Sequence, residues 1–270
     1  MELIRFQKLQ GLGNDFILFD AGELDSIGRE KLDIPSLCDR RLGIGADGVL
    51  IYQVARTGVE VSMVYFNADG SRAETCFNGL RCIALWAVLN GDVQRGKPFV
   101  IQSDAGPVAA AVMLESDEAV VELAGGVSRR NLIRGAVEPV DGCEWDLNFD
   151  FGSLKGIPIS IGNPHFIVWR TQGDITALND EVATIGARVE KARYFPDGTN
   201  FELAVKVDDQ WIRMAVWERG VGLTKACGSG AAAAVCSGVL SGRLAADTPI
   251  DVEMAGGRLS IEALSASGRI

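Results

Sequence analysis

The chain has 270 residues, of which 26 are Lys or Arg and 36 are Asp or Glu, and its formal net charge is −10. Nucleic-acid binding requires clustered basic residues that neutralise phosphates, and no basic stripe is present, so we expect no nucleic-acid partner. The N-terminus is charged and no apolar run reaches the length of a membrane span, which predicts a cytoplasmic protein without a membrane partner.

Cysteine and histidine usage argues against a disulfide scaffold and against zinc. The six cysteines have irregular spacing, there is one histidine, and no C-x-x-C pair occurs. We therefore expect no metal site. The length suggests two domains.

The first half alternates strand-like runs with helical patches. Strands are predicted at 17–20, 49–53, 59–66, 100–103, 108–114 and 119–123, and helices at 34–40 and 80–89. The pattern breaks into small and charged residues at 124–130, where we place the domain boundary. The predicted domains are 1–127, which carries Cys76, and 128–270, which carries Cys227.

The second half repeats this scheme. Strands are predicted at 157–161, 166–169, 201–207 and 211–217, and helices at 179–187 and 230–240. An internal repeat accounts for the similarity. Asn67–Cys76 aligns with Glu218–Cys227 at an offset of 151 residues, and the same offset pairs Met63 with Met214. The chain therefore looks like a duplicated half that presents one cysteine at the same place in each copy.

Each repeated cysteine is followed by a helix-capable tract. Asn78 and Ser229 are good N-cap residues, and the two tracts end in Asn-Gly and Ser-Gly. Each sulfur should therefore lie at a helix N-terminus, where free N–H groups and the helix dipole lower a thiol pKa and favour an anion. A thiolate and a carboxylate-binding cradle would be neighbours.

Two equivalent cysteines that face one cleft could invert a C–H centre, because one sulfur accepts a proton on one side of the carbon and the other donates on the opposite side. One sulfur must be a thiolate and the other a thiol. The ordinary alternative for a free cysteine is a small buried hydrophobe. We keep that interpretation for the cysteines without a counterpart at the repeat offset, which are Cys38, Cys82, Cys143 and Cys236.

Several motifs in order resemble diaminopimelate epimerases. They are GLGNDF at 11–16, GIGADG at 43–48, NADGS at 67–71, CFNGLRC at 76–82, GNPH at 162–165, GTN at 198–200, ERG at 218–220 and ACGSG at 226–230. The resemblance implies an α/β (α+β) fold of two pseudo-symmetric domains. Each domain would be a mixed, mostly antiparallel sheet wrapped around a central helix, with the site between the domains.

The same resemblance implies an isomerase that uses neither pyridoxal phosphate nor any other cofactor. It would interconvert LL- and meso-diaminopimelate by a two-base mechanism, in the biosynthesis of lysine and peptidoglycan precursors. Its partner would be a small amino-acid substrate, and a homodimer is left open.

The resemblance also implies roles for individual residues. Cys76 and Cys227 would be the two bases. Backbone N–H groups of four residues would hold the reacting α-carboxylate, namely Asn78, Gly79, Gly228 and Ser229. The distal amino-acid end of the substrate would be bound by Asn67, Asn163, Asn200 and Arg219. Glu218, His165 and Asn14 would lie near the reacting centre.

Each of these polar residues has an ordinary interpretation too. Glu218 and Arg219 could form a solvated pair at a strand end, since exposed pairs contribute little to stability. His165 could be a structural histidine whose hydrogen bonds are satisfied. Asparagines are frequent turn residues.

The sequence departs from the family pattern in three places. Phe77 stands where glycine usually follows the first cysteine, and could enter the wall of the site or displace the helix start. Leu223 replaces a common glutamate. The sequence reaches Ile270 without an identified further strand for the first sheet. These departures leave substrate choice, rate and the completion of that sheet open.

Three other functions fit part of the pattern. A proline-type racemase, or a racemase acting on another amino acid, would share the cysteines and the fold but would not need the distal asparagines and Arg219. A dehydratase of this fold normally has one cysteine replaced. A non-catalytic redox or binding protein with a Cys76–Cys227 disulfide would not need distal recognition.

Overall fold

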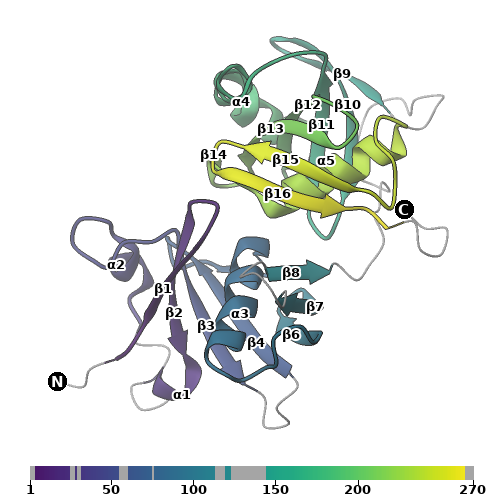
Figure 1. The fold of residues 1–270 in the computed structure, drawn as a ribbon. Coiled ribbons are helices and arrows are strands. Elements are labelled where there is room, and N and C mark those ends of the chain that lie inside the picture. The colour runs from purple at the N-terminus through teal and green to yellow at the C-terminus, as the bar shows by residue number, and fades with distance from the viewer. Residues whose placement is uncertain are drawn as a thin grey trace. The chain divides into compact units, whose positions relative to one another are not determined.

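A computed structural model describes residues 4–24, 28, 32–54, 60–74, 76–112, 119–122 and 144–264. The chain divides into two compact units, Met1–Ala124 and Gly125–Ile270, and Figure 1 shows the elements of each. The boundary expected after residue 127 and Cys143 both lie outside the described residues. Among the helices that are described, none is long and apolar enough to cross a membrane.

A mixed sheet forms the framework of the first unit. Its order is β1-β2-β3-β4-β6-β7-β8, and β5 pairs with β4. The strands are β1 (Gln7–Gly11), β2 (Asn14–Asp20), β3 (Gly48–Val54), β4 (Glu60–Asn67), β5 (Arg72–Ala73), β6 (Phe99–Ser103), β7 (Gly106–Val112) and β8 (Ala119–Glu122). The helices are α1 (Ala21–Leu24), α2 (Ile34–Cys38) and α3 (Phe77–Leu89).

Alternation along β2 and β3 distributes side chains between two cores. Phe16, Leu18 and Leu50 pack with α3 on one face of the sheet. Ile17 and Val49 pack with α1 and α2 on the other face. This is the period of two that strand geometry imposes. The helix α3 contacts β1 and β8 at opposite ends of the strand order, so the sheet curves around it.

The second unit has the corresponding framework. Its sheet order is β16-β15-β13-β12-β11-β10-β9, and β14 pairs with β13. The strands are β9 (Trp145–Phe149), β10 (Gly152–Ser160), β11 (Pro164–Arg170), β12 (Asn200–Lys206), β13 (Trp211–Glu218), β14 (Gly222–Thr224), β15 (Pro249–Met254) and β16 (Gly257–Glu262). The helices are α4 (Ile175–Glu190) and α5 (Gly228–Leu240).

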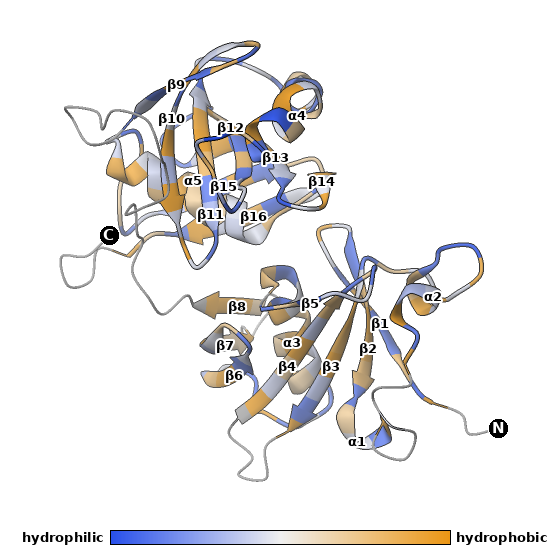
Figure 2. Ribbon diagram, turned by 180° about the vertical axis from the view of Figure 1, so that it is seen from behind, coloured by the Kyte–Doolittle hydropathy of each residue, from blue (hydrophilic) through white to orange (hydrophobic). Residues whose placement is uncertain are grey.

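The two helices of this unit differ in character. One face of α4 is buried, through Leu178, Val182, Ile185 and Val189, and Figure 2 shows the mixture of hydrophilic and hydrophobic residues along this helix. Most of α5 is small and buried, including all four residues Ala231–Ala234. Small side chains allow close packing, so α5 can form the centre around which this sheet curves.

Strand directions confirm the duplication. Parallel pairing joins β2 to β3 and β4 to β6 in the first unit, and β11 to β12 and β13 to β15 in the second. The remaining pairs are antiparallel. Helices α3 and α5 both have 13 residues, and both of their ends differ by the offset of the sequence repeat. The predicted fold class is therefore confirmed.

Several predicted boundaries were wrong. The N-caps are Cys76 and Cys227 rather than Asn78 and Ser229, because each cysteine has extended backbone and accepts the N–H three residues on. Helix α4 begins earlier than predicted, since the Asp174 side chain accepts the Ala177 N–H at 2.9 Å and caps it. The sequence prediction also missed β1, β5, β9, β14, β15 and β16.

Candidate active site

The two cysteines occupy equivalent positions in their own units. Cys76 Sγ accepts the Gly79 N–H at 3.5 Å, and Cys227 Sγ accepts the Gly230 N–H at 3.3 Å. Each cysteine carbonyl also accepts the N–H four residues on, at 2.8 Å and 2.9 Å respectively. The expectation that each sulfur lies at a helix N-terminus is confirmed.

An asparagine pair lies beside Cys76. Asn14 Oδ1 is 4.0 Å from Cys76 Sγ and accepts a hydrogen bond from Asn78 Nδ2 at 3.2 Å. Arg81 in turn donates to Asn78 Oδ1 at 2.5 Å. The structure therefore brings together Asn14, Cys76 and Asn78, three residues expected in the site, and adds Arg81.

A charged network holds Asn14 in this position. Asn14 Nδ2 donates to Asp47 Oδ2 at 3.0 Å, and Arg40 Nη2 lies 2.6 Å from oxygens of both Asp47 and Asp15. Sequence reasoning missed this support. The available signal was the motif at 43–48, which contains Asp47.

Cys227 has a more buried environment, with 5% of its surface exposed. Its Sγ lies 3.2 Å from Ser229 Oγ. Burial raises the pKa of the Cys227 thiol well above its usual value, and the negative charge of Glu218 raises this pKa further. The expected lowering of this thiol pKa was therefore wrong, because desolvation outweighs the hydrogen bonds from Ser229 and Gly230.

Glu218 lies at the end of β13, close to Cys227. Thr224 Oγ1 donates to Glu218 Oε1 at 2.5 Å. Burial raises the pKa of Glu218, while its hydrogen bonds with Thr224 and with Cys227 lower it. Glu218 is thus half-buried and hydrogen-bonded to Thr224 rather than paired with its neighbour Arg219.

A buried histidine–glutamate pair connects to the same cysteine. His165 Nδ1 lies 2.6 Å from Glu202 Oε1, and neither side chain is exposed. His165 Nε2 lies 3.0 Å from Asn163 Oδ1, and Asn163 Nδ2 donates to Ser229 Oγ at 3.4 Å. The expected residues Asn163, His165 and Ser229 are therefore joined.

Sequence reasoning missed Glu202. The sequence feature that could have identified it is a single carboxylate in the otherwise apolar run 201–205. The structure buries all five of these residues in β12. A charged residue is rarely fully buried unless it is paired. The partner, His165, is 37 residues away in the chain, so the pairing depends on the parallel contact of β11 with β12.

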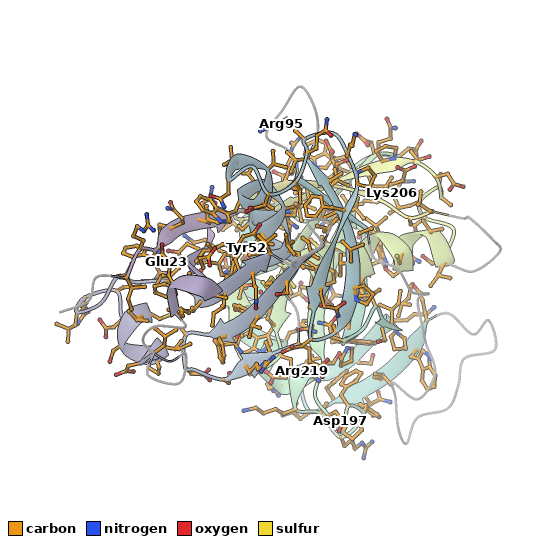
Figure 3. All side chains as sticks on the ribbon, turned by 90° about the horizontal axis from the view of Figure 1, so that it is seen from below. Glu23, Tyr52, Arg95, Asp197, Lys206 and Arg219 are labelled. Carbon is orange, nitrogen blue, oxygen red and sulfur yellow. The ribbon has the colours of Figure 1, made fainter. Side chains whose placement is uncertain are left out.

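The remaining expected residues make hydrogen bonds within their own units. Asn67 donates to Ser71 Oγ at 2.9 Å. Asn200 donates to the Pro164 carbonyl at 2.8 Å and accepts the Arg219 N–H at 2.9 Å. The exposed Arg219 side chain donates to the Asp197 carbonyl at 3.0 Å, and Figure 3 shows these two residues side by side.

The helix starts also supply free N–H groups. Asn78, Gly228 and Ser229 lie in the first turns, whose N–H groups have no partner within a helix. The Gly79 N–H differs, because it points to Cys76 Sγ. Such a turn suits a carboxylate because the helix dipole favours negative charge there.

Two of the departures from the expected motifs have a structural description. Phe77 does not displace the helix start, since α3 begins at Phe77 as α5 begins at Gly228, and its ring packs against the core of the first unit. Leu223 lies on β14 opposite Trp217 and is 42% exposed. Neither change moves a cysteine from its helix terminus.

Solved structures with this fold include racemases and epimerases. A hydroxyproline epimerase from Agrobacterium vitis has a TM-score of 0.66 at 11% identity, covering 98% of this chain and 84% of that one. A predicted epimerase from Pseudomonas aeruginosa has a TM-score of 0.65 at 13% identity, covering 99% and 93%. The chain thus shares its fold with these racemases and epimerases.

The family is defined by closer relatives. The family model for diaminopimelate epimerase matches residues 6–129 and 158–269. Diaminopimelate epimerase 1 from Nostoc sp. is 36% identical over 274 aligned positions, covering 96% of this chain and 91% of that protein. The Geobacillus thermodenitrificans diaminopimelate epimerase is 37% identical, covering 95% and 88%. The chain belongs to the diaminopimelate epimerase family.

Proposed function

We propose that this protein is a diaminopimelate epimerase that interconverts the LL and meso isomers without a cofactor. The observation that carries the proposal is the pair of cysteines that cap α3 and α5 at positions related by the duplication. In the proposed reaction, one thiolate removes the α-proton from one face and the other thiol donates a proton to the opposite face. Cys76 and Cys227 have these roles.

The helix termini support a role in holding the α-carboxylate. In the proposal, the backbone N–H groups of Asn78, Gly228 and Ser229 bind this carboxylate. The Gly79 N–H joins them when it donates to the carboxylate instead of to Cys76 Sγ. Negative charge that develops next to the α-carbon would be stabilised by the same donors. Three further residues lie close to a sulfur or to a residue that contacts one, namely Asn14, His165 and Glu218. These contacts support their proposed position near the reacting centre.

Recognition of the distal end is a further part of the proposal. Asn67, Asn163, Asn200 and Arg219 bind the second amino-acid group of the substrate. The planar guanidinium of Arg219 suits a carboxylate because it can form two parallel hydrogen bonds. Its exposure and its backbone hydrogen bond to Asn200 support this role.

A labelling experiment tests the function. Purified reduced protein is incubated with LL-diaminopimelate in deuterated water, and the product is analysed for the meso isomer and for deuterium at the α-carbon. Both should appear together, since the donated proton comes from a thiol that exchanges with solvent. Racemisation of proline or of a monocarboxylic amino acid, without turnover of diaminopimelate, would instead support the proline-type racemase.

The cellular context follows from the same proposal. We propose a role in forming lysine and peptidoglycan precursors, a cytoplasmic location and a small amino-acid substrate as the partner. A homodimer is an open alternative to a monomer. Sedimentation equilibrium of the full chain would distinguish the two oligomeric states.

A further inference from the structure

Four polar side chains form one line of hydrogen bonds beside Cys76. Arg81 Nη2 donates to Asn78 Oδ1 at 2.5 Å, and Asn78 Nδ2 donates to Asn14 Oδ1 at 3.2 Å. Asn14 Nδ2 then donates to Asp47 Oδ2 at 3.0 Å. The line therefore begins at a guanidinium and ends at a carboxylate, with two neutral amides between them.

The two charged ends fix the direction in which each amide points. A guanidinium can only donate hydrogen bonds, and a carboxylate, here paired with Arg40 at 2.6 Å, can only accept them. An asparagine amide can do either, because turning it over exchanges its oxygen and its nitrogen. Asn78 must therefore turn its oxygen to Arg81. Asn14 must turn its nitrogen to Asp47.

This direction places an oxygen beside the sulfur and leaves two N–H groups available. Asn14 Oδ1 is the amide atom that faces Cys76 Sγ, at 4.0 Å. Each amide nitrogen carries two hydrogens and uses one of them in the line. The second hydrogen of Asn14 Nδ2 and of Asn78 Nδ2 has no partner among the described residues. With both amides turned over, an N–H would face the sulfur instead.

Stability does not explain the presence of Arg81. Its side chain is half-buried against β1, where a Cβ added to Gly11 would be 3.7 Å from Arg81 Nη2. Within the described part of the chain, no acidic side chain forms an ion pair with this guanidinium. Burial lowers the pKa of Arg81, a shift that the thiols of Cys82 and Cys76 oppose. Burying a charge without an ionic partner is costly, which indicates a role other than stability.

The second unit lacks this arrangement. Ala232 stands at the repeat position of Arg81, so no cation begins such a line there. Asn163 lies between Ser229 Oγ and His165 Nε2, two groups that can each donate or accept a hydrogen bond. A charge next to the amide therefore fixes its orientation in the first unit only, and the duplicated fold does not require it.

We propose that Arg81 and Asp47 are positioning residues that hold the amides of Asn78 and Asn14 in one orientation. They keep the Asn14 oxygen toward Cys76 and reserve one N–H of each amide for the carboxylate bound at the start of α3. The use of these N–H groups rests on the proposed function, whereas the orientation of the amides does not.

Neutron diffraction from crystals of the deuterated wild-type protein tests the orientation directly, because it distinguishes nitrogen from oxygen and locates the deuterons. We expect deuterons on the Asn78 atom that faces Asn14 and on the Asn14 atom that faces Asp47. An amide in the opposite orientation, or in a mixture of both, would overturn the proposal. No variant is needed, so the outcome does not depend on how a substitution folds.

Two substitutions separate the donor at position 81 from the bulk of its side chain. Arg81→Met should lower kcat/KM for diaminopimelate about tenfold, since a hydrogen bond to a charged group is lost. Its melting temperature should stay at the wild-type value or rise, because a costly buried charge is removed. Arg81→Lys keeps a group that only donates, and should stay within about threefold of wild type.

Arg5→Met is the matched control, because Arg5 is an exposed arginine of the same unit that pairs with Glu23. Its kcat/KM should equal that of wild type. A purely structural role would instead lower the melting temperature of Arg81→Met and leave its kcat/KM unchanged. That result, or a lysine variant as impaired as the methionine variant, would overturn the role of Arg81.

A double variant tests whether the two ends act together. Either end alone can hold the direction of the line, so losing both should cost more than the product of the single losses. Asp47→Asn replaces the accepting end by an amide that can also donate. Combined with Arg81→Met, it should lower kcat/KM more than about 100-fold. Losses that only multiply would contradict joint orientation. If the amides are oriented as expected but the protein turns over no diaminopimelate, the orientation stands and the proposed function is wrong.

Discussion

Beneath the first turn of α3 lies Leu50, whereas Glu202 occupies the corresponding position beneath α5. The backbone arrangement of the two halves is the same, with a cysteine that caps a central helix. The surroundings of the two sulfurs differ. Neutral asparagines and Arg81 lie beside Cys76, while the charges of Glu218 and Glu202 act on Cys227.

In the proposed two-base mechanism, this difference separates two chemical roles on a duplicated fold. Two-base chemistry requires the sulfurs to differ in protonation at any moment, although the backbone that presents them is duplicated. A few side chains under and beside each helix can produce the difference, because desolvation and neighbouring charges control a thiol pKa. Four experiments test the roles assigned to these residues.

The largest effect should come from removing either sulfur. Cys76→Ala and Cys227→Ala should each lower the epimerisation rate at least about 100- to 10,000-fold, since a positioned acid or base contributes this much. The rate of meso-diaminopimelate formation measures it. Cys38→Ala serves as the control, because Cys38 is the last residue of α2 and is buried in the core formed around that helix. Substantial turnover by either alanine variant would refute the two-base assignment.

The next largest effect should be on stability, when the buried pair of Glu202 and His165 is changed. Glu202→Leu alone should lower the free energy of unfolding by about 3 kcal/mol, because it leaves His165 buried without its partner. Adding His165→Phe reproduces Phe16 and Leu50, the buried apolar pair of the first unit, and should restore stability to the wild-type level or above. Urea denaturation monitored by circular dichroism measures both. A double variant less stable than the single one would contradict the equivalence of the two halves.

A substitution of Arg219 tests how the substrate is recognised, which the comparison of the two sulfurs does not cover. Arg219→Met should lower kcat/KM for diaminopimelate. The loss of transition-state stabilisation should be about 2 kcal/mol, since a hydrogen bond to a charged group is lost. A monocarboxylic amino acid should be little affected. Steady-state kinetics with both substrates decide between the assignments. Equal losses would favour the amino-acid racemase instead.

Alkylation rates should show the smallest effect. Cys76 is half-buried and Cys227 is buried, and the raised pKa of Cys227 keeps its thiolate fraction low at neutral pH. We expect iodoacetamide to label Cys76 at least about tenfold faster, since each pH unit between pH and pKa changes the thiolate fraction about tenfold. Peptide mass spectrometry at timed intervals measures the two rates. Faster labelling of Cys227 would mean that its environment favours the thiolate.

The sequence alone was sufficient to predict the duplication, the two cysteines at helix termini and the fold class. The duplication and the helix-terminal cysteines follow from local signals, namely a repeat of fixed offset, alternating strands and helix-capable tracts that end in glycine. The fold class followed from the resemblance to diaminopimelate epimerases. Boundaries were less accurate because a cap depends on a single side-chain contact. Asn78 and Ser229 resemble N-caps in composition, yet the cysteine sulfurs accept the N–H groups of Gly79 and Gly230.

The surroundings of each sulfur depend on contacts between residues far apart in the chain. Asn163 and Ser229 are 66 residues apart in the chain, and His165 and Glu202 are 37 apart, so no local pattern joins them. The sequence indicated that a helix dipole should lower the Cys227 pKa, but it could not show the burial and the Glu218 charge that reverse the shift. Desolvation depends on everything packed around an atom, and packing is determined by the whole fold rather than by neighbours in the chain.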